Sequence, residues 1–154
     1  MAAVAPESSS SPRIASFLLA RPVWLVGILA ALAGAVVTEA FTLLARVAGV
    51  PMRAAGVWEE RAQDIPVGYI ARSVVMWSIG GVVLAVVLAR WGRRPARTFV
   101  IATVAFTALS LMAPVFARDT AVSTQIVLAA THVLAAAVVI SILARRLSAP
   151  DVGR

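Results

Sequence analysis

Four long apolar segments, separated by short polar stretches, make up most of the chain. They run over residues 22–45, 67–89, 98–117 and 122–144, and arginine or proline stands at or near the ends of each. A helix needs about 20 residues to cross a bilayer's ~30 Å hydrocarbon core, and every segment is that long. The pattern therefore predicts four transmembrane helices, and it contains no strand signature.

These segments predict an all-α fold, an integral membrane four-helix bundle with up-down topology and both termini in the cytoplasm. The bundle would occupy residues 22–146, between an N-terminal tail (1–21) and a C-terminal tail (147–154). The N-terminal tail is rich in serine and proline, which predicts disorder. In the second segment, Gly81, Ala85 and Ala89 share one face, and such small residues favour close helix packing.

The outer loop, residues 46–66, is the one sizeable stretch between the apolar segments. Pro51 and Pro66 bracket a sequence that fits a short helix on the membrane surface, with Val57 and Trp58 toward lipid. An irregular loop fits the same residues equally well, so the sequence leaves both structures open.

The composition agrees with a membrane protein and narrows its chemistry. The chain is 61% hydrophobic and 14% charged, whereas soluble domains carry about 25% charged residues. It has no cysteine, which excludes thiol catalysis and thiolate metal sites. Its single histidine excludes a multi-histidine metal site or a bis-histidine haem within one chain. We expect no cofactor and no bound metal.

The distribution of arginine predicts the orientation in the membrane, because cytoplasmic loops are enriched in basic residues. Nine arginines lie in the two tails, in the loop RWGRRPAR (90–97) and directly after the fourth apolar segment (Arg145 and Arg146), and five lie on the opposite side. The first group faces the cytoplasm in this prediction. The five on the other side are Arg46, Arg53, Arg61, Arg72 and Arg118.

Arginine use also suggests the source and the partners. All 14 basic residues are arginine, which together with the abundance of alanine and valine is typical of a GC-rich bacterial genome, such as those of actinobacteria. The expected location is the bacterial plasma membrane. A net charge of +7 is compatible with nucleic acid. However, the arginines flank apolar segments, so we expect the lipid bilayer as partner, with another membrane protein or a second copy of the chain as open alternatives, and no nucleic acid.

Four motifs carry a resemblance to a known family. They are IPVGYIARS (65–73), WGRRPARTF (91–99), LSLMAP (109–114) and THVLAAAVVISILAR (131–145). In order and spacing they resemble an actinobacterial family of membrane proteins, domain of unknown function six-zero-six-nine, over roughly residues 20 to 147. The resemblance implies four helices and a plasma-membrane location. It implies no known activity, so no functional residue follows from it.

Polar residues within the apolar segments are the candidate functional residues. A helical rise of 1.5 Å per residue places Glu39 about 9 Å, Arg72 about 8 Å and Ser110 about 10 Å below the outer ends of their helices. His132 lies at about 15 Å, near the bilayer middle. Ionisable groups in a membrane usually face the protein interior. We therefore predict an intramembrane polar seam, open toward the outer leaflet. Its candidate members are Glu39, Arg72, Thr107, Ser110, Gln125 and His132.

Within this seam, we predict an ion pair between Glu39 and Arg72, because consecutive antiparallel helices are usually neighbours and pairing offsets the cost of a buried charge. Ser110 would add a donor at the same level. Each residue also has a plainer interpretation. Serine and threonine in helices often donate to a carbonyl of the preceding turn, Arg72 can extend to the headgroups, and His132 can be a neutral structural residue.

The chemistry visible in the sequence favours a non-enzymatic, uncharacterised multi-pass protein with an accessory, assembly or envelope-associated role. We see no nucleophile–base pair and no metal-ligand set. The alternative is a small proton-coupled transporter or exporter, in which Glu39 binds proton and substrate in turn. The lone acidic residue of the first apolar segment favours this alternative, and its position off the midplane speaks against it.

The arginine distribution gives a direct prediction of topology. Reporter fusions after Arg94 and after Arg146 should read as cytoplasmic, and a fusion near Glu60 should read as external. An external signal after Arg94 would show that the arginine count assigns the wrong orientation.

Overall fold

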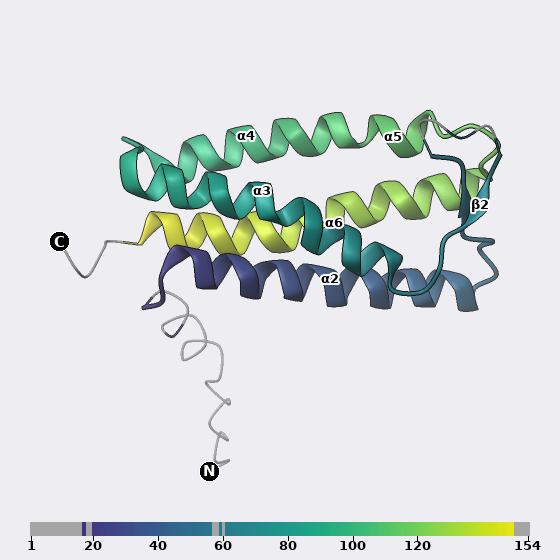
Figure 1. The fold of residues 1–154 in the computed structure, drawn as a ribbon, viewed down its shortest axis with the longest axis horizontal. Helices are drawn as coiled ribbons and strands as arrows, with labels where there is room; N and C mark the ends of the chain where they lie inside the picture. The colour runs from purple at the N-terminus through teal and green to yellow at the C-terminus, as the bar shows by residue number, and fades with distance from the viewer. Residues whose placement is uncertain (1–16, 18–19, 57–58, 60, 150–154) are drawn as a thin grey trace, which may run out of the picture.

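Four long helices form the molecule, and each is long and apolar enough to cross a membrane. The computed structural model describes residues 17, 20–56, 59 and 61–149. The predicted all-α four-helix bundle is confirmed (Figure 1). Most of the predicted N-terminal tail lies outside the described residues. The elements are α2 (Val23–Val47), β1 (Arg53–Ala54), β2 (Gln63–Asp64), α3 (Tyr69–Trp91), α4 (Pro95–Ser110), α5 (Met112–Val115) and α6 (Val122–Ser148).

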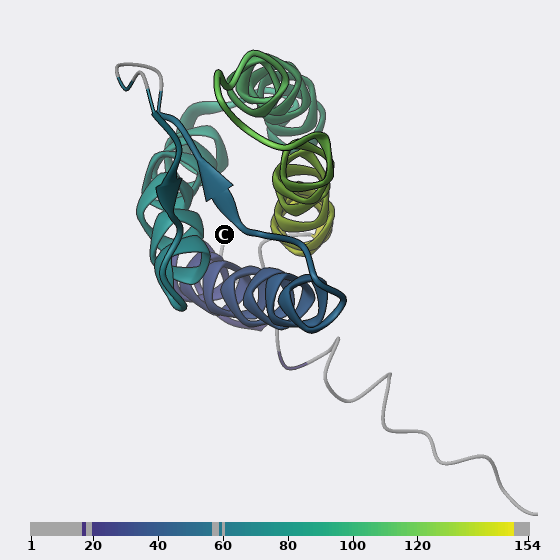
Figure 2. The same cartoon turned by 90° about the vertical axis from the view of Figure 1, so that its right-hand side faces the viewer.

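The helices follow one another in alternating directions and form a closed ring. α2 packs against both α3 and α6, α6 packs against α4, and α3 makes a smaller contact with α4 (Figures 1 and 2). We call the end where α2 stops and α3 starts the hairpin end. The opposite end, where α2 starts and α6 stops, is the termini end.

Local sequence explains where the helices begin and end. Pro22 precedes α2 with φ −61°, the value that suits a helix start. Gly49 follows α2 with φ +86°, a left-handed conformation that glycine adopts without strain. α6 continues to Ser148, and Leu147 is buried. The predicted C-terminal tail therefore starts too early, because arginine and serine at the apolar edge continue the helix.

The third of the four helices long enough to cross a membrane is interrupted near the hairpin end. α4 stops at Ser110 and the short helix α5 follows, so that residues 95–115 form one crossing in two pieces. Pro114 lacks the amide that would bond to the Ser110 carbonyl, which accounts for the break.

A β-hairpin replaces the surface helix or irregular loop that the sequence predicted between the first two crossings. β1 and β2 are antiparallel, with Arg53 opposite Asp64 and Ala54 opposite Gln63. Strands of two residues are too short to show a periodic pattern, so the sequence did not predict them. Val57 and Trp58, predicted to face lipid, lie outside the described residues.

The hairpin crosses the open end of the helix ring (Figure 2). Met52 and Ile65 are buried there and form a small apolar cluster with Ile70 and Val127. The Met52 carbonyl accepts a hydrogen bond from the Ile65 amide at 3.0 Å. Burying a side chain of this size stabilises a fold by roughly 2 kcal/mol. The hairpin is therefore part of the folded core rather than a loose connection.

Polar contacts attach the hairpin to the rest of the bundle. The Ala55 amide donates to Thr120 Oγ1 at 3.2 Å, and the Ala62 amide donates to Asp119 Oδ2 at 3.0 Å. Both acceptors belong to the connection between α5 and α6. From the other side, the Arg46 guanidinium donates to the Ile65 carbonyl. The hairpin is thus fixed to α2 and to the α5–α6 connection at once.

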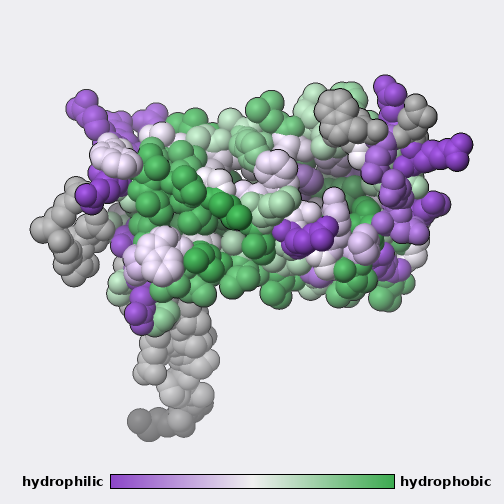
Figure 3. All heavy atoms as spheres, viewed as in Figure 1, coloured by the Kyte–Doolittle hydropathy of each residue, from purple (hydrophilic) through white to green (hydrophobic). Residues whose placement is uncertain are grey.

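The main apolar core lies toward the termini end. Its fully buried members include Val26, Ala30, Ala85, Phe99 and Leu143. Many other apolar side chains point outward, and the face in Figure 3 is mostly apolar along the middle of the bundle, apart from one hydrophilic group, and hydrophilic at its two ends. This distribution fits a surface surrounded by lipid.

Close packing of α2 on α3 depends on Gly27. A Cβ atom added there would lie 2.7 and 2.9 Å from the two γ-carbons of Val82. The small face predicted on the second helix is only partly used for packing. Ala85 is fully buried, whereas a Cβ at Gly81 would meet nothing within 4 Å.

We expect Gly27→Ala to destabilise the bundle by about 1–3 kcal/mol, the usual range for overpacking. Adding Val82→Ala should restore most of the loss. Gly80→Ala is the matched control, because a Cβ there meets nothing within 4 Å. Unfolding of each variant in detergent micelles measures the effect. A Gly27→Ala protein as stable as Gly80→Ala would contradict the close contact.

Candidate functional site

Glu39 lies in the second half of α2, and its carboxylate binds the start of α3. Oε1 accepts a hydrogen bond from the Gly68 amide at 2.6 Å, and Oε2 accepts one from the Ala71 amide at 3.0 Å. Gly68 is the N-cap of α3, and Ala71 is its third helical residue. A capping box satisfies this same pair of amides with side chains of the helix itself. Here a neighbouring helix supplies the acceptors.

The sequence of α3 explains why its first turn needs an outside partner. Gly68 has no side chain that could cap the helix, and the first turn contains no acidic residue. The first amides of a helix have no partner within the helix, and hydrocarbon offers no water to replace one. The start of a helix also carries a partial positive charge, so a carboxylate there is favourable. Glu39 meets both needs.

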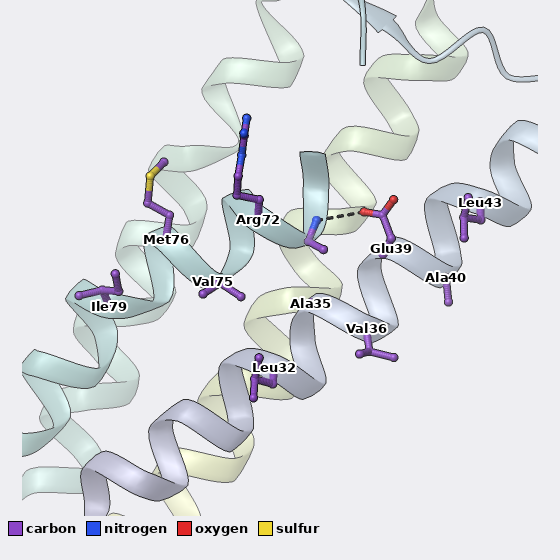
Figure 4. Close-up of a pocket in the computed structure, with 11 residues that line it drawn as sticks. Leu32, Ala35, Val36, Glu39, Ala40, Leu43, Arg72, Val75, Met76 and Ile79 are labelled. Atoms are coloured by element: carbon purple, nitrogen blue, oxygen red, sulfur yellow. Dashed lines mark hydrogen bonds between the residues drawn. The ribbon is translucent and has the colours of Figure 1, made fainter. Parts of the chain in front are cut away.

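The predicted ion pair between Glu39 and Arg72 is wrong. Both carboxylate oxygens are taken up by backbone amides, and no ion pair between the two side chains occurs in the described part of the chain. Arg72 instead places its guanidinium 5.3 Å from the centre of the Tyr69 ring. Figure 4 shows its side chain pointing away from Glu39. The prediction considered only the depth of Glu39 and Arg72 along their helices. The direction in which each side chain leaves the helix axis decides which groups it contacts.

The predicted members of the seam on α4 bond to their own helix. Ser110 Oγ donates to the Thr107 carbonyl at 2.7 Å, and Thr107 Oγ1 donates to the Thr103 carbonyl at 2.8 Å. The plainer interpretation of these hydroxyl groups is thereby confirmed. Ser110 adds no donor to Glu39, whose oxygens bond to the two α3 amides.

The two predicted members on α6 also bond to backbone carbonyls. His132 Nδ1 lies 2.8 Å from the Leu128 carbonyl, one turn earlier in the helix. Gln125 Nε2 donates to the Ala117 carbonyl at 2.9 Å. Gln125 thus ties the first turn of α6 to the connection that precedes it, which is a structural contact.

A set of threonines on α2 and α6 is buried, and it was not among the predicted members of the seam. Two of them are four residues apart on α2 and therefore share a face of that helix. Three of the four hydroxyl groups donate to carbonyls of their own helix. The set consists of Thr38, Thr42, Thr124 and Thr131.

Two buried polar atoms at the hairpin end have no hydrogen-bond partner among the described residues. They are Arg46 Nε and Thr124 Oγ1. The other end of the Arg46 guanidinium bonds to the Ile65 carbonyl. The hairpin end is therefore the more polar part of the bundle interior.

A groove runs between α2 and α3 on the outside of the bundle (Figure 4). Its volume is ≈ 770 Å³, and its walls are almost entirely apolar. Glu39 and Arg72 are the ionisable residues that line it. The remaining lining residues are Leu32, Ala35, Val36, Ala40, Leu43, Ala71, Val75, Met76 and Ile79.

Four helices able to span a membrane, with outward-facing apolar side chains and inward-facing threonines, define a four-helix membrane-protein fold. The chain belongs to the Family of unknown function (DUF6069), which it matches over residues 19–149. No curated protein and no solved structure matches it. The family resemblance predicted from the four motifs is confirmed. The family brings no activity, so the function has to be argued from this geometry.

The observed contacts predict unequal effects for the two charged residues of the groove. Glu39→Gln keeps the size of the side chain but turns an amide group toward one of the two α3 amides. We expect a loss of about 2 kcal/mol, the scale of a hydrogen bond to a charged group. Arg72→Gln, an exposed control, should change stability by less than about 0.5 kcal/mol.

The double variant should lose the sum of the two single losses, since residues without a shared contact behave additively. Detergent unfolding curves of the wild type and the three variants measure this. If the two single variants lose equal stability and the double variant loses less than their sum, Glu39 and Arg72 form an ion pair after all.

Proposed function

We propose that this protein is a non-enzymatic multi-pass membrane protein with an accessory, assembly or envelope-associated role. In this proposal the polar residues within the bundle hold its helices in place and carry no reaction. The observation that supports it most is the use of Glu39, the one acidic residue within the helices that the structure describes, as the cap of α3.

A carboxylate in this position is poorly suited to exchange protons with a substrate. Releasing it from α3 would leave the Gly68 and Ala71 amides without these partners at a part-buried site. An unsatisfied buried donor costs about 1–3 kcal/mol. A transport cycle that uses Glu39 would require this free energy at every turnover. In a structural role the two amides keep their acceptor, and the free energy is not required.

We further propose that both termini face the cytoplasm of a bacterium and that the protein resides in the plasma membrane. The arginine-rich connection at residues 90–97 lies at the termini end, together with the last turn of α6, which carries Arg145 and Arg146. The hairpin would then face the outside, which suits a role in contact with the cell envelope.

One observation favours the second candidate, a small proton-coupled exporter. Glu39 lines the groove between α2 and α3, so a molecule bound in the groove would contact the Glu39 side chain. In that function, proton binding to Glu39 would release α3 and change the groove. The two candidates therefore differ in what Glu39→Gln does.

Proton flux in reconstituted liposomes distinguishes the two functions. With a pH gradient and the lipophilic cation tetraphenylphosphonium, we expect liposomes with the wild-type protein to match protein-free liposomes. Arg118→Gln, an exposed change away from the groove, serves as the reconstitution control. A cation-dependent flux that disappears in a stably folded Glu39→Gln variant would overturn the accessory role and establish the exporter.

A further inference from the structure

We propose that the groove between α2 and α3 binds one anionic phospholipid of the surrounding bilayer. Its phosphate would lie on Arg72, and one acyl chain would lie along the groove. This inference rests on the groove and on Arg72 and does not depend on the proposed function.

The shape and chemistry of the groove fit an acyl chain. Along α2 it extends from Leu32 to Leu43, about 16 Å at the helical rise. Along α3 it extends from Ala71 to Ile79, about 12 Å. Val36 is 69% exposed on one wall and Ile79 60% exposed on the other, so the groove is open to the side. In a membrane, an open apolar groove at this depth is filled by lipid.

Arg72 supplies the charge that selects the headgroup. It is the fourth residue of α3, about 5 Å from the helix start, which suits the boundary between hydrocarbon and headgroups. In the described part of the chain its guanidinium contacts the Tyr69 ring, and no carboxylate forms an ion pair with it. Its N–H donors therefore remain available. Arginine binds phosphate through two parallel hydrogen bonds, which favours a phosphate group as ligand.

The other charged group of the groove does not neutralise Arg72. Both Glu39 oxygens bond to α3 amides, and the two side chains point in different directions (Figure 4). The positive end of α3 offsets part of the Glu39 charge. An anionic headgroup therefore complements Arg72, whereas a zwitterionic headgroup brings its own positive charge close to the guanidinium.

Native mass spectrometry tests this site. The full-length protein is reconstituted into nanodiscs of equal parts phosphatidylglycerol and phosphatidylcholine, released, and examined for retained lipid. We expect the wild type to retain phosphatidylglycerol in preference. Arg72→Gln should lower the ratio of bound phosphatidylglycerol to bound phosphatidylcholine about tenfold, because a neutral side chain no longer favours an anionic headgroup over one that carries its own positive charge. Arg118→Gln, which removes an equal charge at the same end, should leave the ratio unchanged.

A second pair of variants tests the acyl-chain part. Ala40→Phe fills the groove from an exposed position on α2, and we expect it to reduce the retention of both lipids without changing their ratio. Ala102→Phe, at an exposed position on α4, is the matched control. Arg72→Lys should keep most of the preference, which separates loss of charge from loss of fold.

Two outcomes would overturn the proposal. The first is a lipid ratio in Arg72→Gln equal to that in Arg118→Gln, which would place the phosphate elsewhere. The second is lipid retention in Ala40→Phe equal to that in Ala102→Phe, which would place the acyl chain outside the groove. Size-exclusion profiles and unfolding temperatures matching the wild type show that each variant is folded before lipids are counted.

Discussion

The arrangement of this bundle depends on the contact between the Glu39 carboxylate and the first turn of α3. A helix that starts inside or next to hydrocarbon needs partners for its first amides, and α3 has none of its own. Glu39 supplies them from α2 and so fixes where α3 starts relative to α2. The hairpin precedes α3 by a few residues, so its position over the end of the helix ring follows from the same contact. The Arg46 bond to Ile65 then holds it from the α2 side.

The two ends of the bundle are held together by different physical means. At the termini end, apolar side chains such as Val26 and Phe99 are fully buried in one core cluster. At the hairpin end, side chains bond to backbone groups of other elements, as Asp119 and Thr120 do with the hairpin. A hydrogen bond is more directional than apolar packing, and the two bonds from the α3 amides to Glu39 favour one rotation of α3. The position of α3 around its axis is therefore set both by these bonds and by the close contact of Gly27 with Val82.

The sequence predicted the four helices well, because apolar runs of bilayer length permit few other structures. It placed the end of α6 four residues early, since the helix continues past Ala144 through Arg145 and Arg146 to Ser148. The hairpin was not predictable from periodicity in strands of two residues. The level of Glu39 was predictable from the helical rise, but its partners were not. They are the backbone amides of Gly68 and Ala71, and a search of the sequence for polar side chains cannot identify backbone partners.

The preference of Glu39 for α3 amides over Arg72 has an energetic reason. An intramembrane ion pair requires two charges to lose their solvation, and the attraction between them often fails to compensate. The amides at the start of α3 need acceptors in any case, so bonding them to Glu39 satisfies three groups with a single desolvated charge. Arg72 can then turn outward, where its guanidinium lies 5.3 Å from the centre of the Tyr69 ring. The two charged residues that the sequence placed at one depth thus have different contacts, one with backbone amides of α3 and one at the exposed surface.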